Sequence, residues 1–110
     1  MAKINIVISH ALDRDDALER IKGLIQNARE QFAGQFQLED IKENWTKYQG
    51  MFSFSVRKVL ISCNVHIMKK QIIINGKLPL IAIHLKSDIE SAIRTQAQAL
   101  LTASGQENAA

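Results

Sequence analysis

Alternation between hydrophobic and polar residues limits the folds open to this chain more than any other feature. "KINIVIS" places Ile4, Ile6 and Ile8 on one side. "MFSFSV" and "VLISCNVHI" alternate in the same way, and "QIIINGKL" follows after a short connection. This period of two is typical of half-buried strands. Because only short connections separate the last three segments, we expect an antiparallel meander.

Two further stretches have the three-and-four spacing of amphipathic helices. The first begins at Asp13, with acidic residues near its positive N-terminus, and is expected to end at Gly34. The second is expected over residues 87–103, where Ser87 and Glu90 form the pattern of a capping box. The two apolar stripes are Ala17, Ile21, Leu24, Ile25, Ala28 and Phe32, then Ile89, Ala92, Ile93, Ala97, Leu100 and Leu101.

The order of these elements predicts an α+β domain, β-α-β-β-β-β-α, with two helices packed on one face of an antiparallel sheet. Residues 37–48 are its weakest part, since their pattern leaves open whether they form a regular strand before the turn-like "KYQG". With 110 residues, the chain has the size of one domain. We expect this domain over residues 1–103, and a small, polar, frayed tail over 104–110.

Residues 79–85, "PLIAIHL", lie between the last strand and the last helix. Pro79 cannot donate to a strand ladder, so the strand is expected to end near Leu78. The hydrophobic run then has two interpretations. It is either core that crosses between layers, or a surface that contacts something apolar. In the second case Leu80, Ile81 and Ile83 line the mouth of a ligand cavity or touch an apolar surface.

The positive charge is concentrated in the middle of the chain. Net charge is +3, and residues 51–86 hold six Lys or Arg and no Asp or Glu. We rank three explanations: protection of turns and edges, then an anionic surface, then nucleic acid. The last lacks interleaved aromatics or a basic helix, so we expect no nucleic-acid partner. In the second, Lys69, Lys70 and Lys77 hold an anionic head group or carboxylate.

Motifs for catalysis, cofactors and metals are missing from the sequence. It has no glycine-rich phosphate loop, no nucleophile elbow and no metal-binding histidine spacing, so we expect no enzyme, cofactor or metal site. His10, between a strand and a helix, is either a site residue or fixes the turn through a backbone contact. Trp45 either fills the core or floors a ligand pocket.

Two features bear on location. No hydrophobic run approaches the roughly 18 residues of a membrane span. "MAKINIVISH" enters a strand directly and does not have the pattern of a signal peptide, and the single Cys63 fits a reducing compartment. We therefore expect a cytoplasmic protein without a membrane span.

Several motifs in order resemble the polyhydroxyalkanoic acid system protein family. They are "MAKINI", "HAL" at 10–12, the helix with Phe32, Trp45, Gly50, "FSFS", and "GKLPL" followed by "LKSDIE" and Ile93. The resemblance runs from about residue 2 to residue 101. This sequence departs from the family where many members have a second glycine after the one matching Gly50. "MFSFSVRKV" has none, which puts the geometry of that hairpin in question. Many members also have Gly where Ser87 stands.

The resemblance implies a small bacterial cytoplasmic protein, linked by gene neighbourhood to storage-polyester granules, without an established enzymatic mechanism. Our leading hypothesis is a non-enzymatic binding domain for a granule surface or an apolar acyl ligand. The alternative is a self-associating protein whose dimer buries a sheet edge or "PLIAIHL". An enzyme that uses His10 or His66 ranks last, since no partner groups can be nominated.

Overall fold

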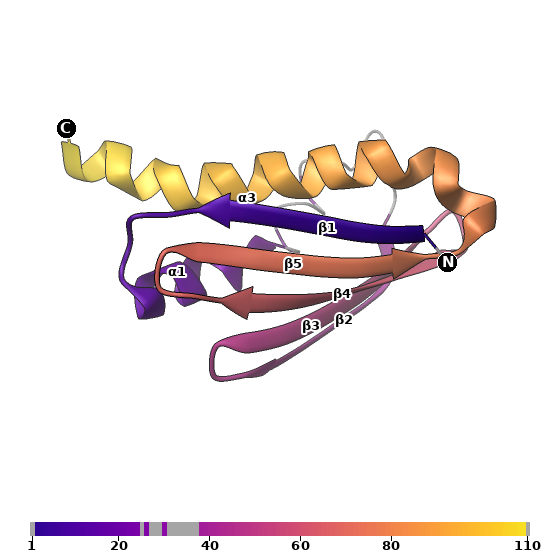
Figure 1. Ribbon diagram of the computed structural model, residues 1–110, viewed down its shortest axis with the longest axis horizontal. Helices are drawn as coiled ribbons and strands as arrows, with labels where there is room; N and C mark the ends of the chain where they lie inside the picture. The colour runs from indigo at the N-terminus through magenta and orange to yellow at the C-terminus, as the bar shows by residue number, and fades with distance from the viewer. Residues whose placement is uncertain (1, 25, 27–29, 31–37, 110) are drawn as a thin grey trace.

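The computed structural model describes residues 2–24, 26, 30 and 38–109 (Figure 1). It confirms the α+β class and the predicted order of elements. The elements are β1 (Ala2–Ser9), α1 (Arg14–Ile21), β2 (Leu38–Thr46), β3 (Gln49–Val56), β4 (Val59–Ile67), β5 (Gln71–Leu78), the 3-10 helix η1 (Leu80–Leu85) and α3 (Lys86–Ala109).

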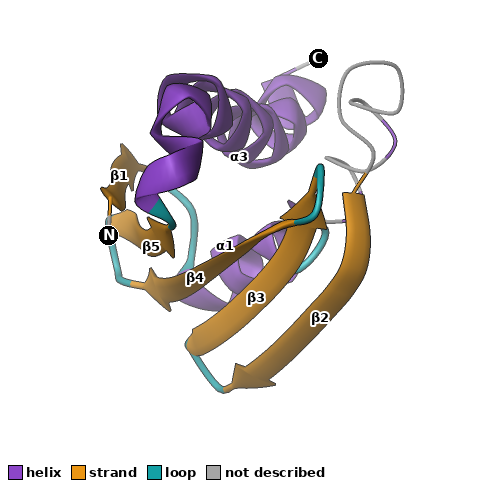
Figure 2. Cartoon of the chain, turned by 90° about the vertical axis from the view of Figure 1, so that its right-hand side faces the viewer, coloured by secondary structure: helices purple, strands orange, loops and turns teal. Residues whose placement is uncertain are grey.

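The strands form one antiparallel sheet in the order β1-β5-β4-β3-β2. The meander of β2 to β5 is therefore as predicted, and β1 joins it beside β5. Both helices lie on the same face of the curved sheet (Figure 2). The alternation explains this arrangement, because one set of strand side chains faces the helices and is buried. That set includes Ile4, Ile6, Ile8, Phe52, Phe54, Val56, Ile61, Cys63, Val65, Ile67, Ile72, Ile74 and Leu78.

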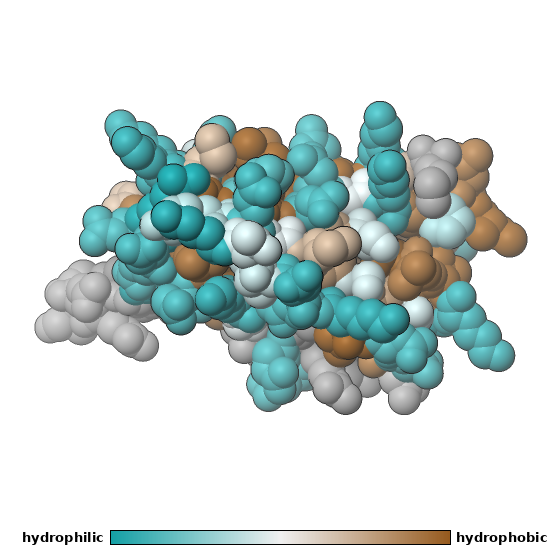
Figure 3. All heavy atoms as spheres, turned by 90° about the horizontal axis from the view of Figure 1, so that it is seen from below, coloured by the Kyte–Doolittle hydropathy of each residue, from teal (hydrophilic) through white to brown (hydrophobic). Residues whose placement is uncertain are grey.

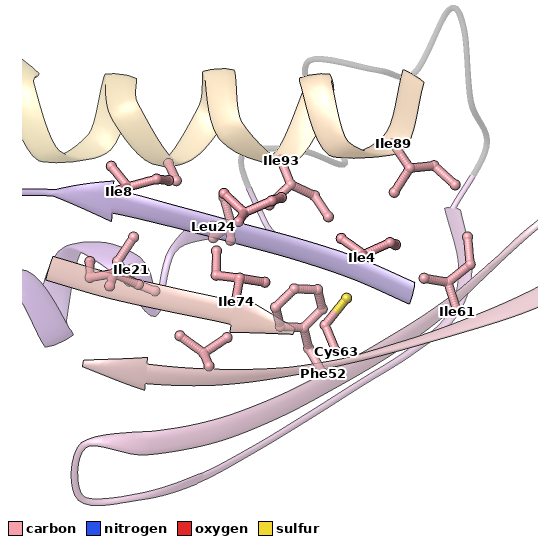
Figure 4. Packing of buried hydrophobic residues seen from close by; sticks show 14 of the residues in the cluster. Ile4, Ile8, Ile21, Leu24, Phe52, Ile61, Cys63, Ile74, Ile89 and Ile93 are labelled. Carbon is pink, nitrogen blue, oxygen red and sulfur yellow. The ribbon is translucent and has the colours of Figure 1, made fainter. Parts of the chain in front are cut away.

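Helix α3 runs along β1 and covers the core from above (Figure 1). In Figure 4, Ile89 and Ile93 project from the side of α3 that faces the strands, toward Ile4 and Ile74. All four are at most 7% exposed. Full burial of such a side chain contributes about 1.5–3 kcal/mol, so this seam accounts for much of the attachment of α3 to the sheet.

The outer edge of β1 is partly covered by side chains of α3. The Asn5 backbone N–H donates to Glu90 Oε2 at 3.4 Å, and Arg94 Nη1 donates to the Val7 carbonyl at 3.4 Å. Glu90 and Arg94 are four residues apart and so lie on one face of the helix. They supply an acceptor and a donor where a neighbouring strand would, which protects this edge from pairing with another chain.

The predicted capping box at Ser87 and Glu90 is wrong. Helix η1 continues directly into α3 through Lys86, whose φ of −55° and ψ of −50° are already helical. Ser87 is therefore inside a continuous helical path and has no free helix end to cap, and Glu90 turns to β1 instead. Helix α3 ends at Ala109.

Helix α1 covers only the first part of the predicted span from Asp13 to Gly34, and Leu24, Gln26 and Glu30 beyond it are again helical. It ends at Ile21, and Lys22 and Gly23 form a turn in which the Gly23 N–H donates to the Arg20 carbonyl at 3.1 Å. Glycine disfavours a helix interior by about 1 kcal/mol relative to alanine, which explains a break here. Three predicted stripe residues and the predicted stop lie outside the described residues; these are Ile25, Ala28, Phe32 and Gly34.

Strand β2 is real but irregular, which answers the question left open for residues 37–48. Its pairing with β3 shifts between Glu39 and Lys42, and Asp40 has a φ of 52°. An extra residue of this kind is a β-bulge, which bends and twists an edge strand. The expected turn follows at Lys47 and Tyr48.

Candidate functional site

The segment after β5 is buried on one side and exposed on the other. Pro79 is extended and ends the strand, and the Ala82 N–H donates to the Pro79 carbonyl at 2.9 Å. Ala82 is 1% exposed and Leu85 is 5% exposed. By contrast, the exposed fractions of the other three hydrophobic residues are 62% for Leu80, 84% for Ile81 and 53% for Ile83.

The segment is not one regular 3-10 helix. Two short helical turns meet at a kink at Ala82, whose φ of −103° and ψ of 15° are not helical. Ala82 and Leu85 are buried among the core residues, whereas Leu80, Ile81 and Ile83 are exposed. The segment is therefore core at Ala82 and Leu85 and exposed at Leu80, Ile81 and Ile83, and contact of these three with an apolar partner stays a prediction. The two buried residues anchor the segment while the three others face outward.

The β3–β4 turn lies at this same end of the sheet. Ser62 of β4 pairs with Lys77 of β5, one residue before β5 ends, so the start of β4 lies at the end of β5 that leads into η1. Leu60, beside that turn, is 56% exposed. We call the group formed by Arg57, Lys58, Leu60, Leu80, Ile81, Ile83 and Lys86 the η1 surface. Figure 3 shows hydrophobic side chains at the end of the molecule that carries η1 and mostly hydrophilic ones over the rest of that face.

The two cations of the β3–β4 turn occupy strained backbone positions. Val56 pairs with Val59, so Arg57 and Lys58 form a two-residue loop, with φ values of 52° and 69°. Such hairpin loops strongly prefer Asn-Gly, because left-handed backbone costs other residues about 1–2 kcal/mol each. The hairpin therefore forms without the second glycine whose absence put its geometry in question. Retaining two basic residues at this cost points to a role other than stability.

His10 makes the backbone contacts of the structural alternative. Its Nδ1 accepts from the Leu12 N–H at 3.1 Å, and its Nε2 lies 3.0 Å from the Met68 carbonyl. Because Nδ1 accepts, the ring proton is on Nε2 and is donated to Met68. The His10 backbone N–H also donates to the Lys70 carbonyl at 2.9 Å. The side chain thus joins the end of β1 to the β4–β5 connection.

Trp45 lies half-buried over Gly50, its partner across the β2–β3 hairpin. A Cβ at position 50 would stand 2.5 Å from the indole ring, so only glycine fits beneath it. The indole N–H donates to Glu43 Oε1 at 2.8 Å. The ring packs against the edge of the hydrophobic core. The indole therefore has packing and hydrogen-bonding partners at the edge of the sheet, far from η1.

A cluster that the sequence did not suggest ties the β2–β3 turn to α1. The Tyr48 hydroxyl donates to Asp15 Oδ1 at 2.6 Å, and the Arg14 guanidinium lies 3.9 Å from the centre of the Tyr48 ring. Arg14 Nε also donates to the Ile67 carbonyl at 2.8 Å. The hydrogen bond to Asp15 raises the pKa of Tyr48, with smaller effects from desolvation and the Asp15 charge. The cluster fixes the turn opposite the η1 end.

The predicted basic residues do not form one group. Lys69 and Lys70 lie in the β4–β5 connection, whereas Lys77 is near the other end of β5. Successive turns of a meander fall at opposite ends of the sheet, so these residues cannot hold one small anion together. Lys77 accompanies Leu80, Ile81 and Ile83 at the η1 end. His10, Trp45, Lys69 and Lys70 lie at the opposite end.

No group of three or more His, Cys, Asp or Glu side chains in the described part of the chain is placed to hold a metal ion. None of the helices described is both long and apolar enough to cross a membrane.

Comparison with known families places the chain. The family described as "Putative polyhydroxyalkanoic acid system protein" matches residues 4–101. The chain belongs to this polyhydroxyalkanoic acid system protein family. The match confirms the resemblance carried by "GKLPL" and "LKSDIE", and it includes η1 and most of α3. Searches among curated proteins and among solved structures found no match.

In this polyhydroxyalkanoic acid system protein, sequence reasoning missed part of the η1 surface. The sequence pattern does not single out Leu60, Arg57 or Lys58. The signal that could have found them is the register, because a two-residue turn after Val56 puts Leu60 near the start of β4, at the end of the sheet where β5 ends.

Proposed function

We propose that this protein is a non-enzymatic accessory domain of the bacterial cytoplasm that docks on polyhydroxyalkanoate granules through the η1 surface. The observation that carries the proposal is the 84% exposure of Ile81 on a turn anchored by the buried Ala82. Membership of the family supports the choice of a polyester granule as the docking partner. The occupant we infer is an apolar polyester surface with anionic amphiphiles at its boundary with water.

The hydrophobic part of the contact comes from Leu60, Leu80, Ile81 and Ile83, each more than half exposed. Complete burial of such a side chain contributes about 1.5–3 kcal/mol, and partial insertion contributes less. Binding also costs free energy, because the protein loses translational and rotational freedom. A few partly inserted side chains therefore give only weak, reversible attachment. The hydrophobic contact therefore needs a second source of affinity.

Charge supplies this second source. Arg57, Lys58 and Lys86 lie at the same end of the sheet as the hydrophobic side chains, while Asp88 in the first turn of α3 opposes them in part. Each basic residue near an anionic lipid surface contributes about 1 kcal/mol. Together, the two contributions predict binding that weakens both when salt is added and when an apolar residue is made polar.

The test is co-sedimentation with polyhydroxybutyrate particles coated with anionic phospholipid. We expect wild-type protein to sediment with the particles and Ile81→Asp to stay in solution while its unfolding midpoint is unchanged. Met68→Asp is the matched control, because Met68 is 39% exposed at the opposite end of the sheet. Equal sedimentation of Ile81→Asp and wild type would reject the η1 surface as the docking site.

Self-association is the alternative function. The edge of β1 is partly covered by Glu90 and Arg94, and the edge strand β2 carries charges and a bulge. Such features discourage strand pairing, so they favour granule docking over a dimer formed through a sheet edge. Light scattering separates the two functions: a stable dimer that persists in Ile81→Asp supports self-association.

A further inference from the structure

The face of the sheet that points away from the helices carries polar rows aligned across the strands. One row places Asn5 of β1 opposite Asn75 of β5, and Asn75 opposite Asn64 of β4. The row beside it, nearer η1, aligns Lys3, Lys77 and Ser62 in the same order. Side chains two residues apart on a strand share a face, so these six form one polar surface.

A hollow of about 530 Å³ lies over these rows. It is lined by Lys3, Asn5, Ser62, Asn64, Asn75 and Lys77, with the backbones of Ile4 and Gly76 between them. This volume is within the range of sites for small molecules, which is about 300–1,000 Å³. Three asparagines and two lysines are among the lining residues, so polar and charged groups are available beside the apolar parts of the lining.

Lys3 and Lys77 are like charges directly opposite each other on neighbouring strands. The Asn5 N–H is directed to Glu90 of α3 and away from β5, so the Asn5–Asn75 pair is not hydrogen-bonded through the backbone. Lys3 and Lys77 lie two residues along the same strands, so they too form a non-hydrogen-bonded pair. In such pairs the opposed residues are closer together than in hydrogen-bonded pairs. Like charges directly opposite each other destabilise a sheet.

Within the described part of the chain, neither lysine forms an ion pair with a carboxylate. The two ion pairs found there, Asp16–Arg20 and Glu19–Lys22, both belong to α1 and its C-terminal end. A bound anion would relieve the repulsion between Lys3 and Lys77 and accept charge-assisted hydrogen bonds from both. The carboxamides of the neighbouring row can donate to and accept from a further polar group on the same molecule.

We infer that this hollow binds a hydroxycarboxylate, with its carboxylate on Lys3 and Lys77 and its hydroxyl or ester oxygens on the asparagine row. The anion site follows from the aligned residues alone. The choice of a hydroxycarboxylate, the monomer class of the storage polyester, rests on the proposed function. The hollow is separate from the side chains of Leu80, Ile81 and Ile83, so the two sites can be tested independently.

The test is NMR titration with 3-hydroxybutyrate, following the side-chain amides of Asn5, Asn64 and Asn75. We expect saturable shifts of these amides, and we expect Lys77→Gln to weaken binding about tenfold, as loss of one charged hydrogen-bond donor does. Lys70→Gln removes the same charge at the opposite end of β5 and should bind like wild type. Equal weakening in both variants, or no saturable shifts of the three amides, would overturn the inference.

Titrations with other ligands test which chemical class the hollow selects. A titration of a docking variant tests whether this site is independent of granule docking. Butyrate, which lacks the hydroxyl, should bind more weakly than 3-hydroxybutyrate, and inorganic phosphate should not match it. If either binds equally well, the hollow does not select hydroxycarboxylates and the inference is wrong. Ile81→Asp should bind 3-hydroxybutyrate like wild type, so failure of docking leaves this result unchanged.

Discussion

Gly76 of β5 lies directly opposite Cys63 of β4, and a side chain at position 76 has no room beside the Cys63 sulfur. A Cβ there would stand 2.7 Å from Cys63 Sγ and 2.9 Å from the Ser62 carbonyl oxygen. Since the second contact is with backbone, the strand itself would have to move. We predict that Gly76→Ala lowers the free energy of unfolding by about 1–3 kcal/mol.

Urea unfolding of wild type and Gly76→Ala measures this effect. Cys63→Ala in the Gly76→Ala background removes the clash with sulfur but leaves the clash with Ser62. The free energy of unfolding lost in the double variant should therefore be smaller than the sum of the losses in the two single variants. The difference should be only partial, because the clash with Ser62 remains. An unfolding free energy of Gly76→Ala equal to that of wild type would show that β4 and β5 are less closely packed here than the structure shows.

The buried thiol of Cys63 makes stability depend on alkaline pH. Burial raises its pKa from 9.0 to about 12. Above pH 9 the unfolded chain loses this proton while the folded chain keeps it, so stability falls as pH rises toward 12. This one group contributes a slope of at most about 1.4 kcal/mol per pH unit.

Unfolding of wild type and Cys63→Ala between pH 8 and pH 11 isolates this contribution, because all other titrating groups, Tyr48 included, are shared. The difference in stability between the two proteins should be constant below about pH 9 and shrink above it. A difference that stays constant throughout would contradict the burial of this thiol.

The strained β3–β4 turn predicts opposite effects on stability and on docking. Replacing Arg57→Asn together with Lys58→Gly should raise the free energy of unfolding by about 1–2 kcal/mol, because both positions have positive φ. It should also weaken binding to anionic particles by about 2 kcal/mol, as two charges are lost. Thermal unfolding and co-sedimentation measure the two effects.

The control is Lys69→Asn together with Lys70→Gly in the β4–β5 connection. It removes the same charge from residues that do not have positive φ. We expect this control to gain no stability and to keep its affinity for the particles. If both double variants lose affinity equally, net charge rather than the η1 surface governs binding.

His10 contributes to stability through its two backbone contacts. In His10→Ala the Leu12 N–H and the Met68 carbonyl lose their partners, and we predict a loss of about 1–3 kcal/mol. Amide hydrogen exchange should accelerate at Leu12 in particular. A general loss of packing would instead accelerate exchange at many residues. His84→Ala, at an exposed position, is the control and should be neutral. Unchanged exchange at Leu12 would contradict the contact.

Much of the fold follows from local pattern. The alternation in β1, β3 and β4 identified the buried face, and short connections fixed the antiparallel order. The ends of the helices were harder to predict from the sequence, because they depend on contacts with neighbouring elements. Ser87 has the sequence of a helix cap, yet the helical backbone of η1 precedes it, and tertiary contact with β1 gives Glu90 another partner.

The candidate site was predictable only in part, because it depends on register. Composition singled out Leu80, Ile81 and Ile83 but could not separate them from Ala82, which the turn geometry buries. The lysines were grouped by type, whereas the meander places Lys69 and Lys70 far from Lys77. The asparagine row is invisible along the chain, since Asn5, Asn64 and Asn75 meet only when three strands pair.

The most direct test of granule docking reports contact at position 81 itself. Ile81→Cys and Met68→Cys each introduce an exposed thiol for an environment-sensitive fluorophore, while Cys63 stays unlabelled because it is buried and protonated. On addition of lipid-coated polyhydroxybutyrate particles, the account predicts a blue-shifted emission at position 81 and none at position 68. Protein that binds the particles without any shift at position 81 would contradict docking through the η1 surface.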